Sequence, residues 1–148
     1  MQILVDSNIL LRSAEVASPQ REAAKESVRV LSKSHQVVIV PQVAYEFWAV
    51  MTRSLAANGL GLSIEEADLQ LRDFLDVFHL IQDERGIFQQ WWEIVRTHKI
   101  KGVPSHDARL VAAMRRHQIS HLLTFNSIHF KNFNDITVLT PEAVLAGN

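Results

Sequence analysis

Three acidic side chains in this sequence occupy positions that suit the binding of a divalent metal ion. Asp6 follows the apolar run 3–5, Glu46 follows the apolar run 37–40, and Asp107 lies near the start of a later helical segment. Carboxyl ends of parallel strands meet at one sheet edge, so alternating strands and helices would bring these carboxylates together. Crowded carboxylates repel one another unless a cation joins them, and oxygen ligands favour Mg²⁺ or Mn²⁺. Such a site suits phosphodiester hydrolysis by a metal-activated water.

Each of these residues also has a purely structural interpretation, which the pattern alone leaves open. Asp6 can cap the following helix, Glu46 can lie at the border of an apolar helix face and pair with Arg53, and Asp107 can offset a helix dipole. Asn126 holds a similar position after residues 121–124, where it can cap a helix or offer an amide oxygen to a metal. The shared sheet edge, rather than any one residue, favours the metal site.

The bulk composition limits the class of protein. The 148 residues suit one domain spanning 1–148, and the absence of cysteine excludes disulfides and thiolate metal sites. No apolar run is as long as a membrane span, and the first residues lack the basic stretch of a signal peptide. We therefore expect a soluble, cytoplasmic protein without a membrane partner.

Charge is distributed unevenly along the chain although the net charge is only −1. Residues 63–86 contain seven acids and two arginines, whereas residues 90–131 contain seven lysines and arginines against two acids, together with five of the seven histidines. The second stretch would attract a polyanion such as RNA, although ordinary solvated helix faces would give the same pattern.

Short apolar runs alternate with longer segments of helical periodicity, which predicts an α/β fold with a parallel sheet and helices on both faces. Strands are predicted at residues 2–5, 37–40, 77–81, 121–124 and 136–139. Helices are predicted at residues 19–34, 42–57, 63–76, 84–99, 106–117 and 127–131. The two consecutive helical segments between 41 and 76 interrupt the alternation and suit a clamp or an interface.

The histidines and aromatic residues do not form a recognisable motif. Catalysis by a histidine pair is a rival way to cleave RNA, but no spacing singles out a pair, and His129 is expected at the surface or at an edge. Phe88, Trp91 and Trp92 are expected in the core or at an interface rather than as platforms for stacked bases.

Three segments together resemble the PIN-domain ribonucleases, and among them the toxin subunits of VapBC-type toxin-antitoxin pairs. The resemblance covers essentially the whole chain. Its segments are the opening Ile-Leu-Val-Asp6-Ser7-Asn8-Ile-Leu-Leu, the segment Gln42-Val-Ala-Tyr-Glu46-Phe, and His106-Asp107-Ala-Arg-Leu-Val-Ala-Ala followed by His121-Leu-Leu-Thr124-Phe-Asn126.

The resemblance implies a three-layer α/β/α sandwich with a mostly parallel sheet. It implies that Asp6, Glu46 and Asp107 are catalytic, with Asp6 and Asp107 as metal ligands and Glu46 and Asn126 binding directly or through water. It places Thr124 beside the site, and we expect Asn8 and Asn126 to support it as well. It further implies Mg²⁺ or Mn²⁺ as cofactor, RNA as substrate, a small antitoxin protein as partner, and a homodimer.

Asn126 departs from the family pattern, because many relatives have an aspartate there. The loss of one negative charge favours one firmly held metal ion, with a second ion binding only when substrate phosphate is present. The sequence therefore predicts a metal-dependent endoribonuclease acting as a toxin. The alternative is a PIN-like module that binds RNA or protein without turnover.

Two further α/β classes fit the sequence less well. A phosphorylatable receiver domain needs an acidic pair after the first strand and a lysine near the last, whereas this chain has Asp6-Ser7-Asn8 and Thr124 there. A haloacid-dehalogenase-type phosphatase needs a second aspartate where Asn8 stands.

Overall fold

The sheet at the centre of the protein has five parallel strands. The structure, a computed structural model, describes residues 1–147, and its strands lie in the order β3-β2-β1-β4-β5. They are β1 (Gln2–Val5), β2 (Gln36–Ile39), β3 (His79–Leu80), β4 (His121–Leu123) and β5 (Thr137–Leu139). All five predicted strands are confirmed, and the main difference is that β3 is shorter than residues 77–81.

The helices connect and cover these strands. They are α1 (Ser7–Ala14), α2 (Arg21–Leu31), α3 (Pro41–Thr52), α4 (Ile64–Val77), α5 (Gly86–Thr97), α6 (Pro104–Arg116) and α7 (Pro141–Leu145), with short 3₁₀ helices η1 (Leu55–Ala57) and η2 (Ser127–Phe130). The predicted helix 42–57 is too long, because α3 ends at Thr52 and η1 follows. The predicted helix 127–131 is a 3₁₀ helix. Helix α1 was considered only as a helix that Asp6 could cap, without bounds, and α7 was not predicted.

Helix starts follow local sequence rules. Pro41 and Pro104 occupy the first turns of α3 and α6, where the missing backbone N–H costs nothing. Ser63 and Glu66 form a capping box at the start of α4, as their spacing predicts. Within residues 1–147, no helix combines the length and the apolar character needed to cross a membrane.

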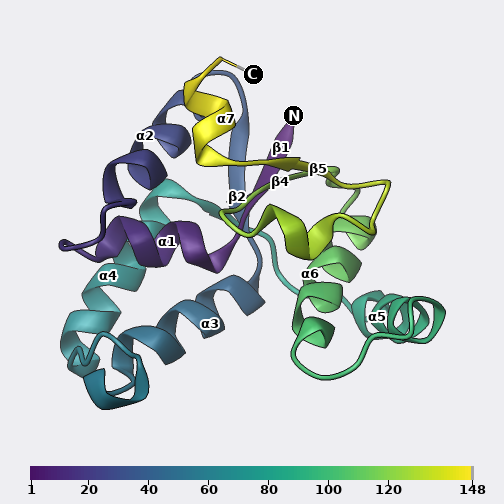
Figure 1. The fold of residues 1–148 in the computed structure, drawn as a ribbon, viewed down its shortest axis with the longest axis horizontal. Coiled ribbons are helices and arrows are strands. Elements are labelled where there is room, and N and C mark those ends of the chain that lie inside the picture. The colour runs from purple at the N-terminus through teal and green to yellow at the C-terminus, as the bar shows by residue number, and fades with distance from the viewer. Residues whose placement is uncertain (148) are drawn as a thin grey trace.

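The order of the strands explains the three layers. From β1 the chain proceeds to β2 and β3 at one edge, and then crosses to β4 and β5 at the other. Because parallel crossovers are right-handed, this reversal sends α1–α4 to one face and α5 and α6 to the other (Figure 1). The result is a PIN-like α/β/α sandwich, as predicted. The reversal lies between β1 and β4, and ligands in such folds bind where those strands end.

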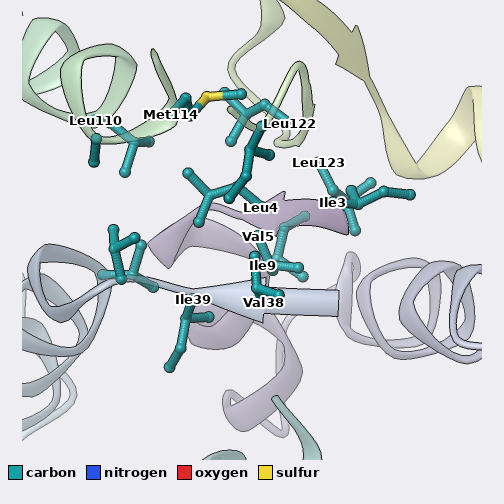
Figure 2. Packing of buried hydrophobic residues seen from close by; sticks show 14 of the residues in the cluster. Ile3, Leu4, Val5, Ile9, Val38, Ile39, Leu110, Met114, Leu122 and Leu123 are labelled. Carbon is teal, nitrogen blue, oxygen red and sulfur yellow. The ribbon is translucent and has the colours of Figure 1, made fainter. Parts of the chain in front are cut away.

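The central strands are buried on both faces, so they read as continuous apolar runs. Ile3, Leu4 and Val5 of β1 are fully buried, and the neighbouring strand residues are nearly so. Ile9 of α1 and Met114 of α6 pack near them from the two helix layers (Figure 2). This packing fixes where β1 and β4 end. It therefore also fixes the positions of the residues that directly follow these strands.

Candidate active site

Asp6 lies directly after β1 and is only 8% exposed. Its Oδ1 accepts a hydrogen bond from the backbone N–H of Ser7 at 2.7 Å, so Asp6 caps α1 as the structural interpretation proposed. Its Oδ2 accepts from Thr124 Oγ1 at 2.8 Å. Burial raises the pKa of the Asp6 carboxyl above its ordinary value, while these two donors oppose the rise. Asp6 is therefore both a helix cap and a desolvated acid at the sheet edge.

Thr124 and Asn8 hold the Asp6 carboxylate in place. The fully buried Thr124 hydroxyl donates to Asp6 and accepts from Asn8 Nδ2 at 3.0 Å and from the backbone N–H of Asn126 at 3.0 Å. Asn8 Nδ2 also lies 3.3 Å from Asp6 Oδ2, and Asn8 Oδ1 accepts from the backbone N–H of Phe125. One donated and two accepted bonds use the full capacity of the hydroxyl, so the ends of β1 and β4 are bonded together.

Glu46 extends from α3 toward the same edge. Its Oε1 accepts from Gln42 Nε2 at 2.8 Å, and its Oε2 accepts from Ser7 Oγ at 3.3 Å. Burial raises the pKa of Glu46, and the charges of Asp6 and Asp107 raise it further. The three acids are thus near enough to repel one another. The predicted pair with Arg53 is absent from the ion pairs of residues 1–147, because Glu46 turns toward Ser7 and Gln42.

Asp107 lies in the first turn of α6 and is partly buried. Its Oδ2 is 3.4 Å from His129 Nδ1, a contact between α6 and η2. Burial raises the pKa of Asp107, the nearby His129 lowers it, and the charge of Asp6 raises it. Asp107 therefore faces the end of β1 as its helical position predicts.

Asn126 lies at the start of η2 and is exposed. Among residues 1–147 its side chain has no cap hydrogen bond, and only its backbone N–H is tied to Thr124. The capping interpretation of its side chain is therefore wrong. The amide is left beside Thr124 at the rim of the site.

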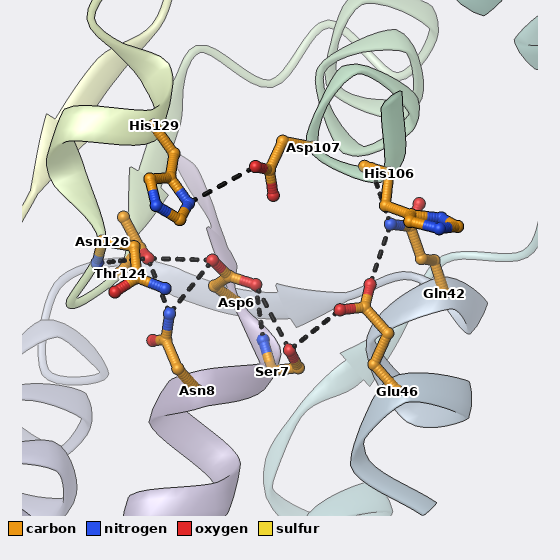
Figure 3. Close-up of polar contacts among 10 residues, drawn as sticks. All are labelled: Asp6, Ser7, Asn8, Gln42, Glu46, His106, Asp107, Thr124, Asn126 and His129. Atoms are coloured by element: carbon orange, nitrogen blue, oxygen red, sulfur yellow. Dashed lines mark hydrogen bonds and ion pairs between the residues drawn. The ribbon is translucent and has the colours of Figure 1, made fainter. Parts of the chain in front are cut away.

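The three carboxylates come from three different elements and face a common space, as Figure 3 shows. They do not form a closed metal cage, because no three Asp, Glu or His side chains in the described part of the chain are gathered tightly enough to hold an ion. The hydrogen bonds explain the spacing: Ser7 and Thr124 hold Asp6, Gln42 holds Glu46, and His129 contacts Asp107.

Four residues that contact the site were not singled out by the sequence: Ser7, Gln42, Arg109 and His129. Gln42 is buried and is bonded on both sides, because it donates to Glu46 and to the His106 carbonyl and accepts from Arg109 Nη1 at 3.1 Å. The spacing of Gln42 and Glu46, four residues apart on one helix, was a usable signal for this pair. The contact of His129 depends on the path of η2, which the sequence does not specify.

Comparisons with known proteins agree with this architecture. The family model for the PIN domain matches residues 3–136. No curated protein matches the sequence. VapBC2 from Rickettsia felis, solved bound to a DNA fragment from their promoter, has a chain with TM-score 0.73 and 16% identity, covering 95% of this chain and 98% of that chain.

Two other solved structures are similar in fold. VapBC-1 from nontypeable Haemophilus influenzae gives a TM-score of 0.73 at 14% identity, covering 96% of this chain and 99% of that chain. VapC20 from Mycobacterium tuberculosis, a sarcin-ricin loop cleaving toxin, gives a TM-score of 0.67 at 19% identity. The match covers 88% of this chain and 95% of that chain. Identities this low establish a common fold and nothing finer.

Proposed function

Because this chain belongs to the PIN domain family, we propose that it is a Mg²⁺- or Mn²⁺-dependent endoribonuclease that acts as the toxin of a toxin-antitoxin pair. The observation that carries the proposal is the convergence of Asp6, Glu46 and Asp107 at the switch point of the sheet. Burial raises the pKa of all three acids, which is the electrostatic state that a divalent cation would relieve.

The donor atoms at this edge fit a hard cation by their chemistry. They are carboxylate oxygens of Asp6, Glu46 and Asp107, with the exposed Asn126 amide close by. In this proposal Asp6 and Asp107 bind the ion, and Glu46 and Asn126 contact it directly or through water. A bound ion would supply an activated water and would neutralise charge on the scissile phosphate.

The protein's own contribution is to fix the acids before substrate arrives. Thr124 and Ser7 hold the two oxygens of Asp6 in a defined orientation, and Gln42 does the same for Glu46. Hydrogen-bonded supports of this kind keep ligand geometry constant, and their loss commonly weakens metal sites. Thr124, Asn8 and Gln42 are therefore positioning residues in this proposal.

The proposed partners are an RNA substrate and a small antitoxin. The fold neighbours include VapBC complexes and a toxin-antitoxin complex from Klebsiella pneumoniae, which supports a cognate antitoxin for this chain. A homodimer is part of the same proposal, by analogy with the family.

RNA cleavage with and without a chelator tests the proposed function. The wild-type protein should cleave RNA with Mg²⁺ or Mn²⁺, lose cleavage in chelator, and leave products with a 5′-phosphate and a 3′-hydroxyl. Asp107→Asn should be inactive, whereas Asp73→Asn, the same chemical change at an exposed position of α4, should retain activity. Cleavage that resists the chelator, or a fully active Asp107→Asn protein, contradicts the proposal.

The alternative is a PIN-like module that binds RNA or protein without turnover. Asn126 is the observation in its favour, because an exposed amide replaces an anionic ligand at the rim. RNA binding without cleavage under any divalent metal would support this alternative over the nuclease.

A further inference from the structure

A cavity opens between the first turns of α5 and α6, outside the carboxylate cluster. Its volume is about 520 Å³, within the range of small-molecule sites, and its lining is mainly apolar. Ile87, Phe88 and Trp91 form its apolar part, and Ser105, His106 and Arg109 contribute polar groups. This mixture of aromatic faces with a few polar groups suits a flat, polar ring such as a nucleobase.

Of the three aromatic residues of α5, which were expected in the core or at an interface, Phe88 and Trp92 are exposed and Trp91 is partly buried against the core. Phe88 is 62% exposed and Trp92 is 45% exposed. Their rings lie close together, with centroids 5.9 Å apart for Phe88 and Trp91 and 6.2 Å apart for Phe88 and Trp92. Exposed aromatic clusters on a soluble domain mark binding surfaces, since leaving such area in water is unfavourable.

Trp91 is held in a fixed orientation at the cavity wall. Its indole Nε1 donates to the backbone carbonyl of Ser105 at 2.8 Å, which ties α5 to the first turn of α6. A ring fixed in this way loses little conformational entropy when a ligand stacks on it. The cavity therefore has one preorganised aromatic wall and one exposed aromatic residue, Phe88, at its opening.

Hydrogen bonds connect the cavity wall to the candidate active site. Arg109, on the cavity wall, donates to Gln42, and Gln42 donates to Glu46 at 2.8 Å. His106, also on the wall, immediately precedes Asp107 in α6. Two successive hydrogen bonds thus link Arg109 on the cavity wall to the carboxylate of Glu46.

Charge around the cavity suits an anionic chain. Residues 90–131, which include most of α5 and all of α6, carry seven lysines and arginines against two acids. The two acids of the cavity wall are already paired, Asp83 with Arg109 at 3.2 Å and Glu84 with Arg116 at 2.6 Å.

A cation also lies beside the exposed aromatic residues of α5. The guanidinium of Arg96 lies over the Trp92 ring, 4.7 Å from its centroid. Aromatic faces beside cations are the usual combination in sites for single-stranded nucleic acid.

We infer that the cavity between α5 and α6 binds one unpaired nucleobase of the RNA, next to the phosphate held at the carboxylates. The base stacks on Phe88 and Trp91, and Arg109 and Ser105 face its edge. This inference rests on the proposed nuclease function. It makes the cavity a determinant of where the RNA is cut, because only an unstacked base can enter it.

The test compares Phe88→Ala with Leu69→Ala on single-stranded RNA. Both residues are exposed, at 62% and 63%, and Leu69 lies on α4, so neither change should disturb folding. With a fluorescent mixed-sequence RNA of twelve nucleotides, Phe88→Ala should raise KM about tenfold, the usual effect of losing one stacked base. Leu69→Ala should match the wild type, and Phe88→Trp should restore binding.

RNAs that each lack one base identify the nucleotide in the cavity. For the wild-type protein, one abasic position beside the cleavage site should raise KM by a similar factor. On that abasic RNA, Phe88→Ala should have the same KM as the wild type. Cleavage of this abasic RNA, which has no ring to stack on Phe88, should be equal in wild type and Phe88→Ala but absent in Asp107→Asn.

The outcomes separate the two proposals. An unchanged KM in Phe88→Ala, with active wild type, overturns the base subsite and leaves the nuclease standing. A Phe88→Ala protein whose mass in solution falls from two copies to one while RNA affinity is unchanged assigns the aromatic cluster to a protein interface instead. A wild type that cleaves neither substrate removes both proposals.

Discussion

The inner and outer halves of the candidate site are built very differently. The inner half lies at the ends of β1 and β4 and is buried. There the single side chain of Asp6 accepts hydrogen bonds from three residues, Ser7, Asn8 and Thr124. The outer half, formed by α6 and η2, has one 3.4 Å contact between Asp107 and His129 and an exposed Asn126. One half is held by several buried hydrogen bonds, and the other has few side-chain contacts.

This contrast suggests a division of labour between the halves. Rigid supports suit a residue that must present the same geometry to every ion, whereas loosely held residues can adjust when substrate arrives. Under the proposed function, Asp6 defines the metal position, and Asp107 and Asn126 complete it. The following changes test that division, beginning with the largest expected effect.

Replacement of the central acid should have the largest effect. Asp6→Asn should lower kcat for RNA cleavage by at least about 10³-fold, because it removes a proposed metal ligand that no other residue can replace. Asn126→Ala, in the outer half, should lower kcat by about tenfold or less in the same assay. Equal losses in the two variants would show that the halves are not distinct.

Loss of the buried hydroxyl should weaken the inner half without changing its shape. Thr124→Val leaves the Asn126 N–H without its acceptor, removes one of the two acceptors of Asn8 Nδ2, and removes the hydroxyl donor to Asp6. Unpaired buried groups cost about 1 to 3 kcal/mol each, so urea denaturation should show a loss of that order. Thr124→Ser keeps the hydroxyl, so its free energy of unfolding should fall by less than half as much as that of Thr124→Val. If Thr124→Val is as stable as the wild type, the network does not fix the inner half.

Added charge at the rim should strengthen the outer half. Asn126→Asp should tighten Mg²⁺ or Mn²⁺ binding about three- to tenfold, because affinity for these ions rises with the number of charged ligands. Asn58→Asp, which adds the same charge at an exposed position after η1, serves as the control for net charge. A metal titration unchanged by Asn126→Asp would place this residue outside the site.

Removal of one repelling acid should stabilise the metal-free protein slightly. Because burial raises the pKa of Asp6, Glu46 and Asp107, the folded protein retains protons that the unfolded chain has released. Its free energy of unfolding therefore falls as the pH rises from about 4 through the raised pKa values. In chelator at neutral pH, Glu46→Gln should be more stable by on the order of 1 kcal/mol, with a shallower pH dependence. A less stable Glu46→Gln protein would mean that repulsion is not the dominant effect there.

The sequence predicted much of the fold because its strands are short apolar runs separated by marked helix starts, such as Pro41, Pro104 and the Ser63–Glu66 box. It did not delimit α1, the helix that Asp6 caps, because this helix has only eight residues and follows β1 after a single residue. Short helices depend on tertiary packing more than on local sequence, so the sequence pattern alone does not identify their bounds.

The sequence also placed Asp6, Glu46 and Asp107 at one edge, because helical periodicity and the ends of strands determine which way those residues face. It did not reveal that Gln42 and Arg109 connect this edge to a cavity, or that His129 contacts Asp107. Those contacts depend on how α3, α5, α6 and η2 pack, which is a property of the whole chain. For the same reason, it did not show which aromatic residues of α5 are buried and which are exposed.

Direct titration of Mn²⁺ into the RNA-free protein tests the central claim, that the acids at the switch point form a divalent metal site. Calorimetry should show one saturable site in the wild type and in Asp73→Asn, with affinity lowered at least about tenfold in Asp6→Asn and in Asp107→Asn. Equal affinity in wild type, Asp6→Asn and Asp107→Asn would contradict it.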